Sequence, residues 1–399
     1  MNEKKAIVFP SLSLGLAVAR ALGRMGVPII ALYYKEKAVA QFSKYVVERV
    51  HIPQSHTNKK SVIKWLLDSG ERHRGSLVIP ADDQFVELCS KHKRALEAYY
   101  TVAVCEWNIA RIALEKRRTY ELAERAGIPH PRTRAPRSLE EAIAMAEAIG
   151  YPCILKPSES YKYQNVFRDK LAVVSSEKEL IEAYKRANDR HLTVLLQESI
   201  PGDDSLNVNY CSYFSDGKPV AECTAQKLRM HPPRYGVARV AVSRYIPDII
   251  EPGREILKAM GYNGLSLIEF KKDIRDGLYK VMDINIRPYL TATLAPECGV
   301  NLPYIMYRHM MYGDVPSFTK QKEGIYWIDL TKDAAHFFTS RSIERYPLRD
   351  YLKPYLGRKT FAILSFKDPL PFLEWMWYLL RYCVRKIVSS ITRSLHKSQ

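Results

Sequence analysis

The sequence of 399 residues has no pair of cysteines spaced as CxxC, and its seven cysteines are scattered at irregular intervals. A dispersed, odd-numbered set of thiols argues against a disulfide framework and a zinc site, and it predicts reduced thiols in a cytoplasmic protein. The chain begins MNEKKAIVFP and enters a strand-like run almost at once, so we expect no signal peptide.

Acidic residues are in the minority. Lys and Arg number 61 against 43 Asp and Glu, which gives a formal net charge of +18. Such an excess favours nucleic acid, an anionic membrane surface or phosphorylated substrates as partners. The sequence has no zinc-finger spacing, no RNP-like aromatic motif and no continuous basic arm, so we expect no nucleic-acid partner. The length and the 47% hydrophobic content predict a globular protein of two or three domains.

A dinucleotide fingerprint is also absent. Strand-like runs such as KAIVFP and VPIIALYY alternate with helical segments at Leu14 to Gly26 and Lys59 to Ser69, which predicts a Rossmann-like parallel sheet covered by helices. The turn after the first strand contains only Gly15, so G-x-G-x-x-G is missing and a nicotinamide dehydrogenase is disfavoured. Asp82 and Asp83 follow a later strand, where ligands bind in such sheets; we favour helix capping there.

What is present is an acidic strand pair in residues 265–288, with Asp-Gly at its turn. Residues two apart on a strand share a face. The polar side chains expected on one face are Glu269, Asp283, Asn285 and Arg287. Carboxylate and amide oxygens suit Mg²⁺ beside phosphates, and an arginine suits a developing phosphoryl or acyl-phosphate charge. A solvated sheet face would show the same alternation, so features elsewhere in the chain decide between the two readings.

Upstream segments supply those features. Lys116 lies in a segment, Arg111 to Arg125, that reads as one basic helix, and Lys156 ends the apolar strand of YPCILKPS. Two lysines beside a nucleotide would neutralise its phosphates as point charges. The strand of LTVLLQESIPGDD then runs into a polar turn, which could hold adenine and ribose. Its candidate residues are Gln197, Glu198, Ser199 and Ile200 for adenine and Asp204 for ribose.

The order Lys116, GIPHP, ILKPS, LLQESIPG and EF…DINIRP resembles the ATP-grasp superfamily, and most closely its carboxylate–amine ligases of the D-aspartate ligase type. The resemblance covers roughly residues 1–315 and implies an α/β protein. Its expected parts are an N-terminal Rossmann-like pre-ATP-grasp domain (1–107), a two-lobed ATP-grasp α+β domain (108–316) and a C-terminal helical extension (317–399). The small lobe is expected at about 130–200 and the large lobe at about 201–316.

The resemblance also implies roles and cofactors. ATP and Mg²⁺ are expected, with two ions and with Mn²⁺ as an alternative metal. Lys116 and Lys156 would contact the ATP phosphates, the segment from Gln197 to Ile200 would hold adenine, and Asp204 would hold ribose. Glu269, Asp283 and Asn285 would ligate the metal, and Arg287 would stabilise an acyl phosphate.

The sequence departs from the family pattern in one place and matches it in another. The segment 158–170 contains no glycine, whereas many relatives cover the phosphates with a glycine-rich loop. Ser158, Ser160 and Lys162 are candidates for a lid that closes through side chains. Lys227 and Arg229 resemble a K-x-R…P…G element that would face phosphate or a substrate anion; the alternative is a basic, exposed strand.

These features predict an ATP-dependent ligase that joins a carboxylate to an amine through an acyl phosphate. The expected partners are a small carboxylate such as an amino acid, an amine acceptor on a cell-wall or surface-polysaccharide precursor, and a second copy of the chain. The alternative is a nucleotide-binding scaffold or a catalytically silent relative.

The tail from about Pro369 has a different character. Aromatic residues alternate with basic ones, and its apolar stretch is interrupted too early for the roughly twenty residues of a membrane span. An amphipathic helix of this kind predicts peripheral contact with the inner face of an anionic membrane, and the alternative is a helix docked on the body. The candidate residues are Phe372, Trp375, Trp377 and Tyr378, with Arg381, Arg385, Lys386 and Arg393.

Overall fold

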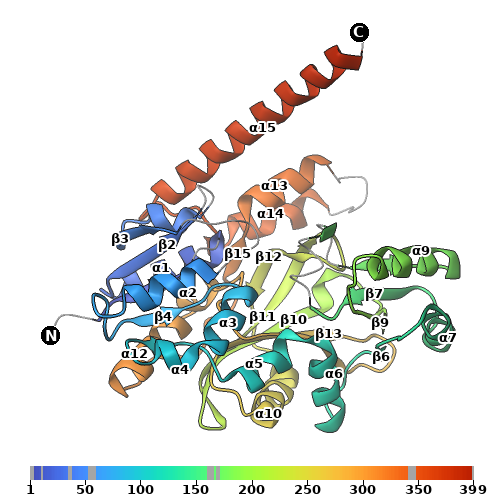
Figure 1. The fold of residues 1–399 in the computed structure, drawn as a ribbon, viewed down its shortest axis with the longest axis horizontal. Coiled ribbons are helices and arrows are strands. Elements are labelled where there is room, and N and C mark those ends of the chain that lie inside the picture. The colour runs from blue at the N-terminus through green and yellow to red at the C-terminus, as the bar shows by residue number, and fades with distance from the viewer. Residues whose placement is uncertain are drawn as a thin grey trace.

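The computed structural model describes residues 4–9, 12–34, 38–52, 60–159, 166–167, 171–339 and 347–397. The chain forms three sheets with flanking helices, and a long C-terminal helix projects away from them (Figure 1). Within the described residues, no helix is both long enough and apolar enough to cross a membrane.

The first sheet is parallel, in the order β3-β2-β1-β4-β5. Its strands are β1 (Ala6–Val8), β2 (Ile29–Tyr33), β3 (Val46–His51), β4 (Leu77–Ile79) and β5 (Thr101–Val102). They are joined by α1 (Ser13–Gly23), η1 (Val39–Phe42), α2 (Lys60–Asp68), α3 (Asp83–Lys91) and α4 (Lys93–Leu96). Every residue of β1 and β4 is buried, as a parallel sheet covered on both faces requires. The predicted Rossmann-like domain is confirmed.

The next segment differs from the single basic helix that the sequence predicted. The chain forms α5 (Trp107–Leu114) and α6 (Lys116–Arg125), separated by an extended residue at Glu115. At this break the backbone N–H of Lys116 donates to the carbonyl oxygen of Ser158, at 2.9 Å. Because Ser158 directly follows β7, the bond holds the start of α6 beside the end of that strand.

A small antiparallel sheet follows, in the order β6-β9-β7-β8. Its strands are β6 (Thr133–Arg134), β7 (Cys153–Pro157), β8 (Ala172–Val174) and β9 (Val194–Glu198), and its helices are α7 (Leu139–Ile149) and α9 (Glu177–Asn188). Both helices begin at a serine N-cap, since Ser138 Oγ accepts from the N–H of Glu141 and Ser176 Oγ from that of Glu179. Alanines of α7 and tyrosine and leucine of α9 pack with β7 and β9 in one apolar cluster.

The largest sheet has the order β14-β13-β10-β11-β12-β15-β16. Its strands are β10 (Asn207–Ser215), β11 (Lys218–His231), β12 (Val237–Ser243), β13 (Gly264–Lys272), β14 (Tyr279–Asn285), β15 (Tyr326–Ile328) and β16 (Lys359–Phe361). η2 (Asp204–Leu206) precedes β10, and between the later strands lie η3 (Pro247–Ile249), α10 (Ile250–Met260), α11 (Leu294–Glu297) and α12 (Leu302–Tyr312). Residues of α10 and α12 belong to two different apolar clusters, and each cluster also includes residues of the N-terminal sheet.

The C-terminal extension contributes to this sheet rather than standing apart from it. β15 pairs with β12, and β16 pairs in parallel with β15. The helices α13 (Leu330–Thr339), α14 (Leu348–Leu356) and α15 (Leu370–Lys397) complete the extension. The two lobes expected of the ATP-grasp architecture are therefore the small antiparallel sheet and the large sheet, and the predicted fold class is confirmed.

Candidate functional site

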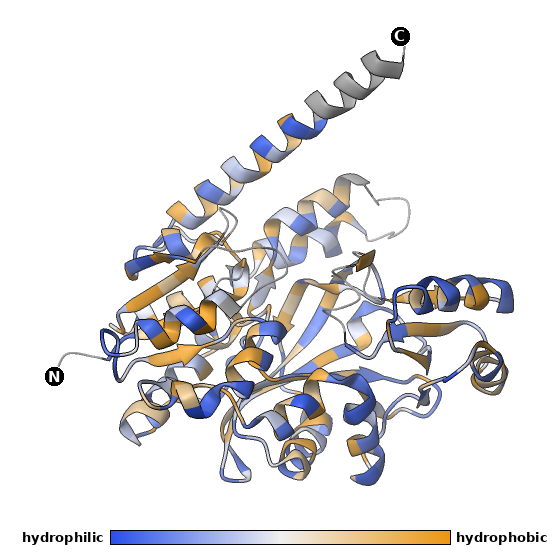
Figure 2. Cartoon of the chain, viewed as in Figure 1, coloured by the Kyte–Doolittle hydropathy of each residue, from blue (hydrophilic) through white to orange (hydrophobic). Residues whose placement is uncertain are grey.

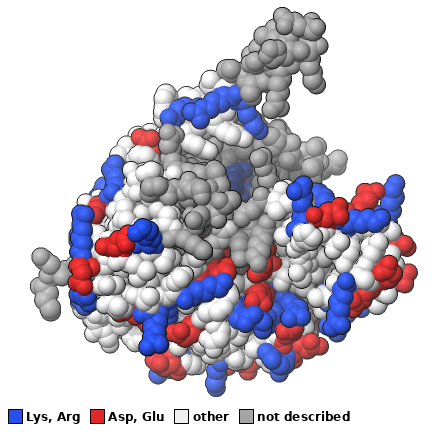
Figure 3. Space-filling model, viewed as in Figure 1, with Lys and Arg blue, Asp and Glu red and all other residues white. Residues whose placement is uncertain are grey.

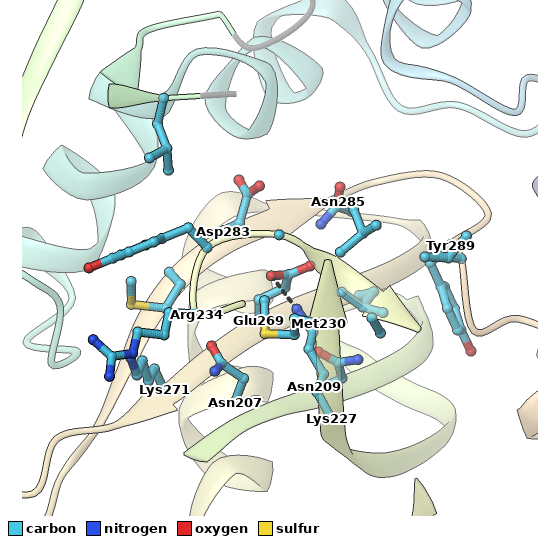
Figure 4. Close-up of a pocket in the computed structure, with 18 of the residues that line it drawn as sticks. Asn207, Asn209, Lys227, Met230, Arg234, Glu269, Lys271, Asp283, Asn285 and Tyr289 are labelled. Atoms are coloured by element: carbon cyan, nitrogen blue, oxygen red, sulfur yellow. Dashed lines mark hydrogen bonds and ion pairs between the residues drawn. The ribbon is translucent and has the colours of Figure 1, made fainter. Parts of the chain in front are cut away.

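A cavity of about 260 Å³ lies between the small antiparallel sheet and the large sheet. Side chains from α3, α6, β7, β9 and β10 to β14 line it, and Figure 4 shows the part contributed by the large sheet. Nine of the thirteen residues that the sequence assigned to a site line this cavity: Lys116, Lys156, Gln197, Ile200, Lys227, Glu269, Asp283, Asn285 and Arg287.

The hairpin of β13 and β14 places the acidic residues. Glu269 pairs in register with Asp283, and Leu267 pairs with Asn285. Residues directly opposite each other on antiparallel strands project to the same face. The two carboxylates therefore share the face that forms the cavity floor, as the Asp-Gly turn and the alternating pattern predicted.

Each of these carboxylates meets a lysine from another element. Lys116 Nζ lies 2.5 Å from Asp283 Oδ1, and Lys227 Nζ lies 2.7 Å from Glu269 Oε2 (Figure 4 shows the second pair). Burial, the largest single effect, would raise the pKa of Asp283. The charge and hydrogen bond of Lys116, with the charges of Lys156 and Arg287, together outweigh burial, so the pKa lies below its ordinary value. A divalent cation and a polyphosphate would both find groups of opposite charge in this cavity.

Lys156 is a buried ammonium group of the cavity, with 7% of its surface exposed. Its Nζ donates to Tyr120 Oη at 2.6 Å, and Tyr120 Oη donates to the carbonyl oxygen of Met282 at 2.6 Å. Burial, and then the charge of Lys116, lower the pKa of Lys156 well below its ordinary value. A bound anion would reverse that shift, because it would offset the cost of keeping this lysine charged.

Asn209 is a cavity residue that the sequence prediction did not identify. It lies on β10, in register with Glu269 of β13, and only 1% of its surface is exposed. Its carboxamide oxygen has no hydrogen-bond partner, although a buried polar atom normally has one. The alternating pattern Asn207-Val208-Asn209 was the available signal, since both asparagines line the cavity while the valine is buried in the core.

Asp83 is a second cavity residue outside the predicted site; the sequence analysis considered it together with Asp82 and favoured helix capping. Asp82 caps α3, because its Oδ1 accepts from the N–H of Phe85, as predicted. Asp83 instead accepts from Arg287, whose Nε lies 2.6 Å from Asp83 Oδ1. This ion pair joins the N-terminal domain to the large sheet at the edge of the cavity.

Three of the residues predicted to hold adenine and ribose do not line the cavity. Glu198 pairs with Arg275, at 2.6 Å, and Ser199 Oγ lies 3.0 Å from Tyr235 Oη. Asp204 is buried.

The carboxylate of Asp204 accepts two backbone N–H groups. These donors are Met230, at 2.7 Å, and Arg234, at 2.6 Å. Asp204 therefore fixes the loop between β11 and β12, whose residues line the cavity, rather than lining it itself.

Arg229 also lies elsewhere. Its Nη1 is 2.8 Å from Asp333 Oδ2 of α13, its Nη2 donates to the carbonyl oxygen of Tyr351 at 2.6 Å, and its guanidinium lies over the Tyr351 ring. The register of β11 and β12 is irregular between Lys227 and Arg229, which separates the two side chains. Arg229 therefore fastens the C-terminal extension to the sheet. Of the lid candidates, Ser160 and Lys162 lie outside the described residues.

A metal ion fits the donor atoms of this cavity. Within the described ranges, no three His, Cys, Asp or Glu side chains gather as a metal-binding cluster. The predicted set instead combines two carboxylates with the amide of Asn285, and Asn209 adds a buried oxygen that lacks a partner. Oxygen ligands of this kind are those that Mg²⁺ prefers.

Known proteins share parts of this sequence and its fold. No protein-family model matches the chain. The D-aspartate ligase of Enterococcus faecium (strain Aus0004) is 25% identical over 245 residues, which are 58% of this chain and 58% of that protein. The biotin carboxylase domain of the Hydrogenobacter thermophilus 2-oxoglutarate carboxylase, in complex with MgADP, ADP and bicarbonate, has a TM-score of 0.63 at 17% identity, covering 82% of this chain and 74% of that one.

An L-amino acid ligase from Bacillus licheniformis has a TM-score of 0.61 at 14% identity, covering 78% of this chain and 75% of that one. The chain therefore has the ATP-grasp fold, and the predicted resemblance is confirmed. Its match spans little more than half of the D-aspartate ligase, so the activity and substrates of that enzyme are proposals for this chain.

Proposed function

We propose that this protein, with its ATP-grasp fold, is an ATP-dependent ligase that joins a carboxylate to an amine. The observation that carries the proposal is the pair of lysine–carboxylate contacts, Lys116 with Asp283 and Lys227 with Glu269, inside one cavity between the two lobes. Both signs of charge are thus held within reach of one ligand, as MgATP requires.

ATP would lie with its base toward β9 and its phosphates toward the lysines. Gln197 and Ile200 line the cavity at the end of β9, and Ile154, Met230 and Met282 supply apolar contacts for a flat base. Lys116 and Lys156 would neutralise the phosphates as point charges. For Lys156 this restores the charged form that burial disfavours.

Glu269, Asp283 and Asn285 would hold Mg²⁺, and Asn209 would add a further oxygen. Held there, Mg²⁺ would supply positive charge that offsets the phosphate charge opposing nucleophilic attack. Two ions are expected there from the resemblance to ATP-grasp enzymes. Mn²⁺ prefers the same oxygen ligands and is expected to substitute.

The reaction would proceed in two displacements. A carboxylate oxygen of the first substrate attacks the γ-phosphorus of ATP, and the bond to the β-phosphate oxygen breaks to release ADP. The amine nitrogen of the second substrate then attacks the carbonyl carbon of the acyl phosphate, so that phosphate leaves and the nitrogen loses a proton. Arg287, held by Asp83, would stabilise the negative charge that develops at the acyl phosphate.

The substrate class is inferred from the D-aspartate ligase likeness. We take the carboxylate to be an amino acid and the amine to belong to a precursor of the cell wall or of a surface polysaccharide. The competing hypothesis is a nucleotide-binding protein without turnover.

The test is phosphate release with ATP and Mg²⁺ across a panel of amino acids, with and without amine acceptors. We expect release that depends on one carboxylate and is strongly reduced in Asp283→Asn, which removes a charge from the proposed metal site. Asp276→Asn is the matched control, because Asp276 lies in the turn of the same hairpin, away from the cavity. Nucleotide binding without phosphate release for any substrate would favour the competing hypothesis. If the unchanged protein neither bound nucleotide nor released phosphate, the proposed site would be refuted.

A further inference from the structure

The C-terminal extension exposes an unusual share of the apolar surface. Among the described residues, 22 large hydrophobic side chains are exposed, and eleven of them fall between residues 348 and 384. That segment is about a tenth of the 399-residue chain, so the clustering is not a general property of the surface. The eleven are Leu348, Leu352, Leu356, Phe366, Leu370, Leu373, Met376, Trp377, Leu380, Tyr382 and Val384.

Helix α15 is docked on the body at its N-terminal end, which we call the base. The rest of the helix projects away from the body, and we call it the shaft (Figure 1). At the base, Asp368 is buried and pairs with Arg20 at 2.9 Å, while Phe372 and Trp375 pack against the body. Beyond this base the helix leaves the body (Figure 1). This corrects the sequence prediction in part: Phe372 and Trp375 anchor the helix to the protein and are not part of its exposed face.

The exposed face of the shaft is an apolar stripe. Leu373, Trp377, Leu380 and Val384 recur at intervals of four, three and four residues, so they lie along one side of the helix. Their exposed fractions are 58%, 54%, 55% and 51%. Orange and blue residues alternate along the shaft in Figure 2, as expected of an amphipathic helix.

Helix α14 carries a similar stripe. Leu348, Leu352 and Leu356 recur every four residues and are exposed, and Phe366 in the link to α15 is 88% exposed. Exposed apolar side chains are therefore not confined to one helix. We call the exposed side chains of α14, the link and the shaft together the extension surface.

The charge of the extension surface is strongly positive. Residues 347–386 contain eight Lys or Arg and three Asp or Glu, and one of the acidic residues, Asp368, is already paired with Arg20. On the shaft, Arg381 lies over the Trp377 ring and Lys386 over the Tyr382 ring. Figure 3 shows basic side chains along the shaft below the grey atoms. Aromatic rings flanked by cations are typical of helices that lie in a membrane interface.

We propose that the extension surface binds an anionic lipid bilayer, with the shaft of α15 lying in the interface. Its leucines, Trp377 and Val384 enter the boundary between headgroups and acyl chains, and Arg381, Arg385 and Lys386 meet lipid phosphates. A second copy of the chain fits less well, because pairing two shafts would bring like charges together. The inference is independent of the reaction proposed for the cavity.

The experiment is sedimentation of the full chain with vesicles. We compare phosphatidylcholine mixed equally with phosphatidylglycerol against phosphatidylcholine alone, at low and at high salt. Each cation near an anionic surface contributes a factor of about five to binding. Arg385→Gln with Lys386→Gln should therefore weaken binding about 30-fold, and Leu373→Glu with Leu380→Glu should abolish it.

Matched controls come from the rest of the surface. Lys178→Gln with Arg190→Gln removes two exposed cations from α9 and its C-terminal end, and Ile274→Glu with Leu278→Glu alters two exposed apolar residues of a turn. Both controls should bind like the unchanged protein, and all variants should keep its melting temperature. Equal binding to the two vesicle types, or equal weakening by the controls, would overturn the proposal. A different outcome would also overturn it: light scattering shows an oligomer of the unchanged protein, Leu373→Glu with Leu380→Glu dissociates that oligomer, and the unchanged protein does not bind vesicles.

Discussion

Lys227 and Arg229 lie two residues apart on β11, yet their side chains lie in different places and have different partners. Lys227 lines the cavity and pairs with Glu269, whereas Arg229 is buried against Asp333 and Tyr351 of the extension. Replacing each with methionine keeps a similar apolar stem and removes only the charged group. We predict that Arg229→Met lowers stability and that Lys227→Met lowers nucleotide affinity.

The expected sizes follow from burial. Removing one partner of a buried ion pair costs about 3–5 kcal/mol, and because Asp333 keeps Arg239 at 2.8 Å as a partner, we take the lower figure. With an unfolding entropy of about 2.1 cal/mol/K per residue, a loss of about 3 kcal/mol lowers the melting temperature by about 4 °C for a chain of this length. Glu269 remains one-third exposed, so water can solvate it, and Lys227→Met should cost less than about 1 kcal/mol.

Both quantities are measurable on the same samples. Scanning calorimetry without ligand gives the melting temperature, and titration calorimetry with MgATP, well below that temperature, gives the affinity. We expect Arg229→Met to melt earlier with near-normal affinity and Lys227→Met to melt normally with affinity reduced at least tenfold. The opposite pattern, with intact stability and lost affinity for Arg229→Met, would refute the placement of Arg229.

Three further predictions concern buried charges. Lys156→Met should raise the melting temperature by at least about 1 °C while removing MgATP binding, because burial disfavours the charged lysine; a lower melting temperature would contradict this. Asp204→Ala should lower both the melting temperature and the affinity, since two backbone N–H groups lose their acceptor; unchanged stability with lost affinity would instead support direct contact with ribose. Burial lowers the pKa of His73 below its ordinary value of 6.5, so the unfolded state binds the proton more readily and stability is lost as the pH falls from 6.5 through the folded-state pKa. His73→Phe should reduce that acid sensitivity, measured as melting temperature against pH, and an unchanged profile would exclude the effect.

The parts of the site that the sequence predicted are those set by local pattern. Alternation of polar and apolar residues and an Asp-Gly turn are enough to specify the hairpin and to put Glu269 and Asp283 on one face. A lysine that ends an apolar strand, such as Lys156, has its backbone position fixed by the same pattern. The hairpin and the position of Lys156 depend on residues close together in the chain, so the periodicity of the sequence is enough to predict them.

The parts that the sequence did not predict depend on partners far along the chain. Asp83 and Arg287 are 204 residues apart, and Arg229 and Asp333 are 104 apart. Nothing in the local pattern around Arg229 distinguishes a residue that faces a phosphate from one that meets a buried aspartate of a later helix. The break at Glu115 had a weak local signal, because every neighbouring residue is an acceptable helix former.

Residues that hold other side chains in place explain how the cavity keeps its shape. Asp204 fixes the end of β11 and the loop after it, which contribute Met230 and Arg234, and Tyr120 fixes the ammonium group of Lys156. Neither of these supports needs to touch a ligand to be necessary, because misplacing a charged group by about 1 Å is enough to weaken catalysis strongly. Substitutions at such supports should therefore change stability and affinity together. Substitutions at Asp283, which pairs with Lys116 inside the cavity, should change affinity and turnover with little change in stability. The ratio of the two effects thus separates residues that meet the ligand from residues that position them, which inspection of the strand pattern alone could not do.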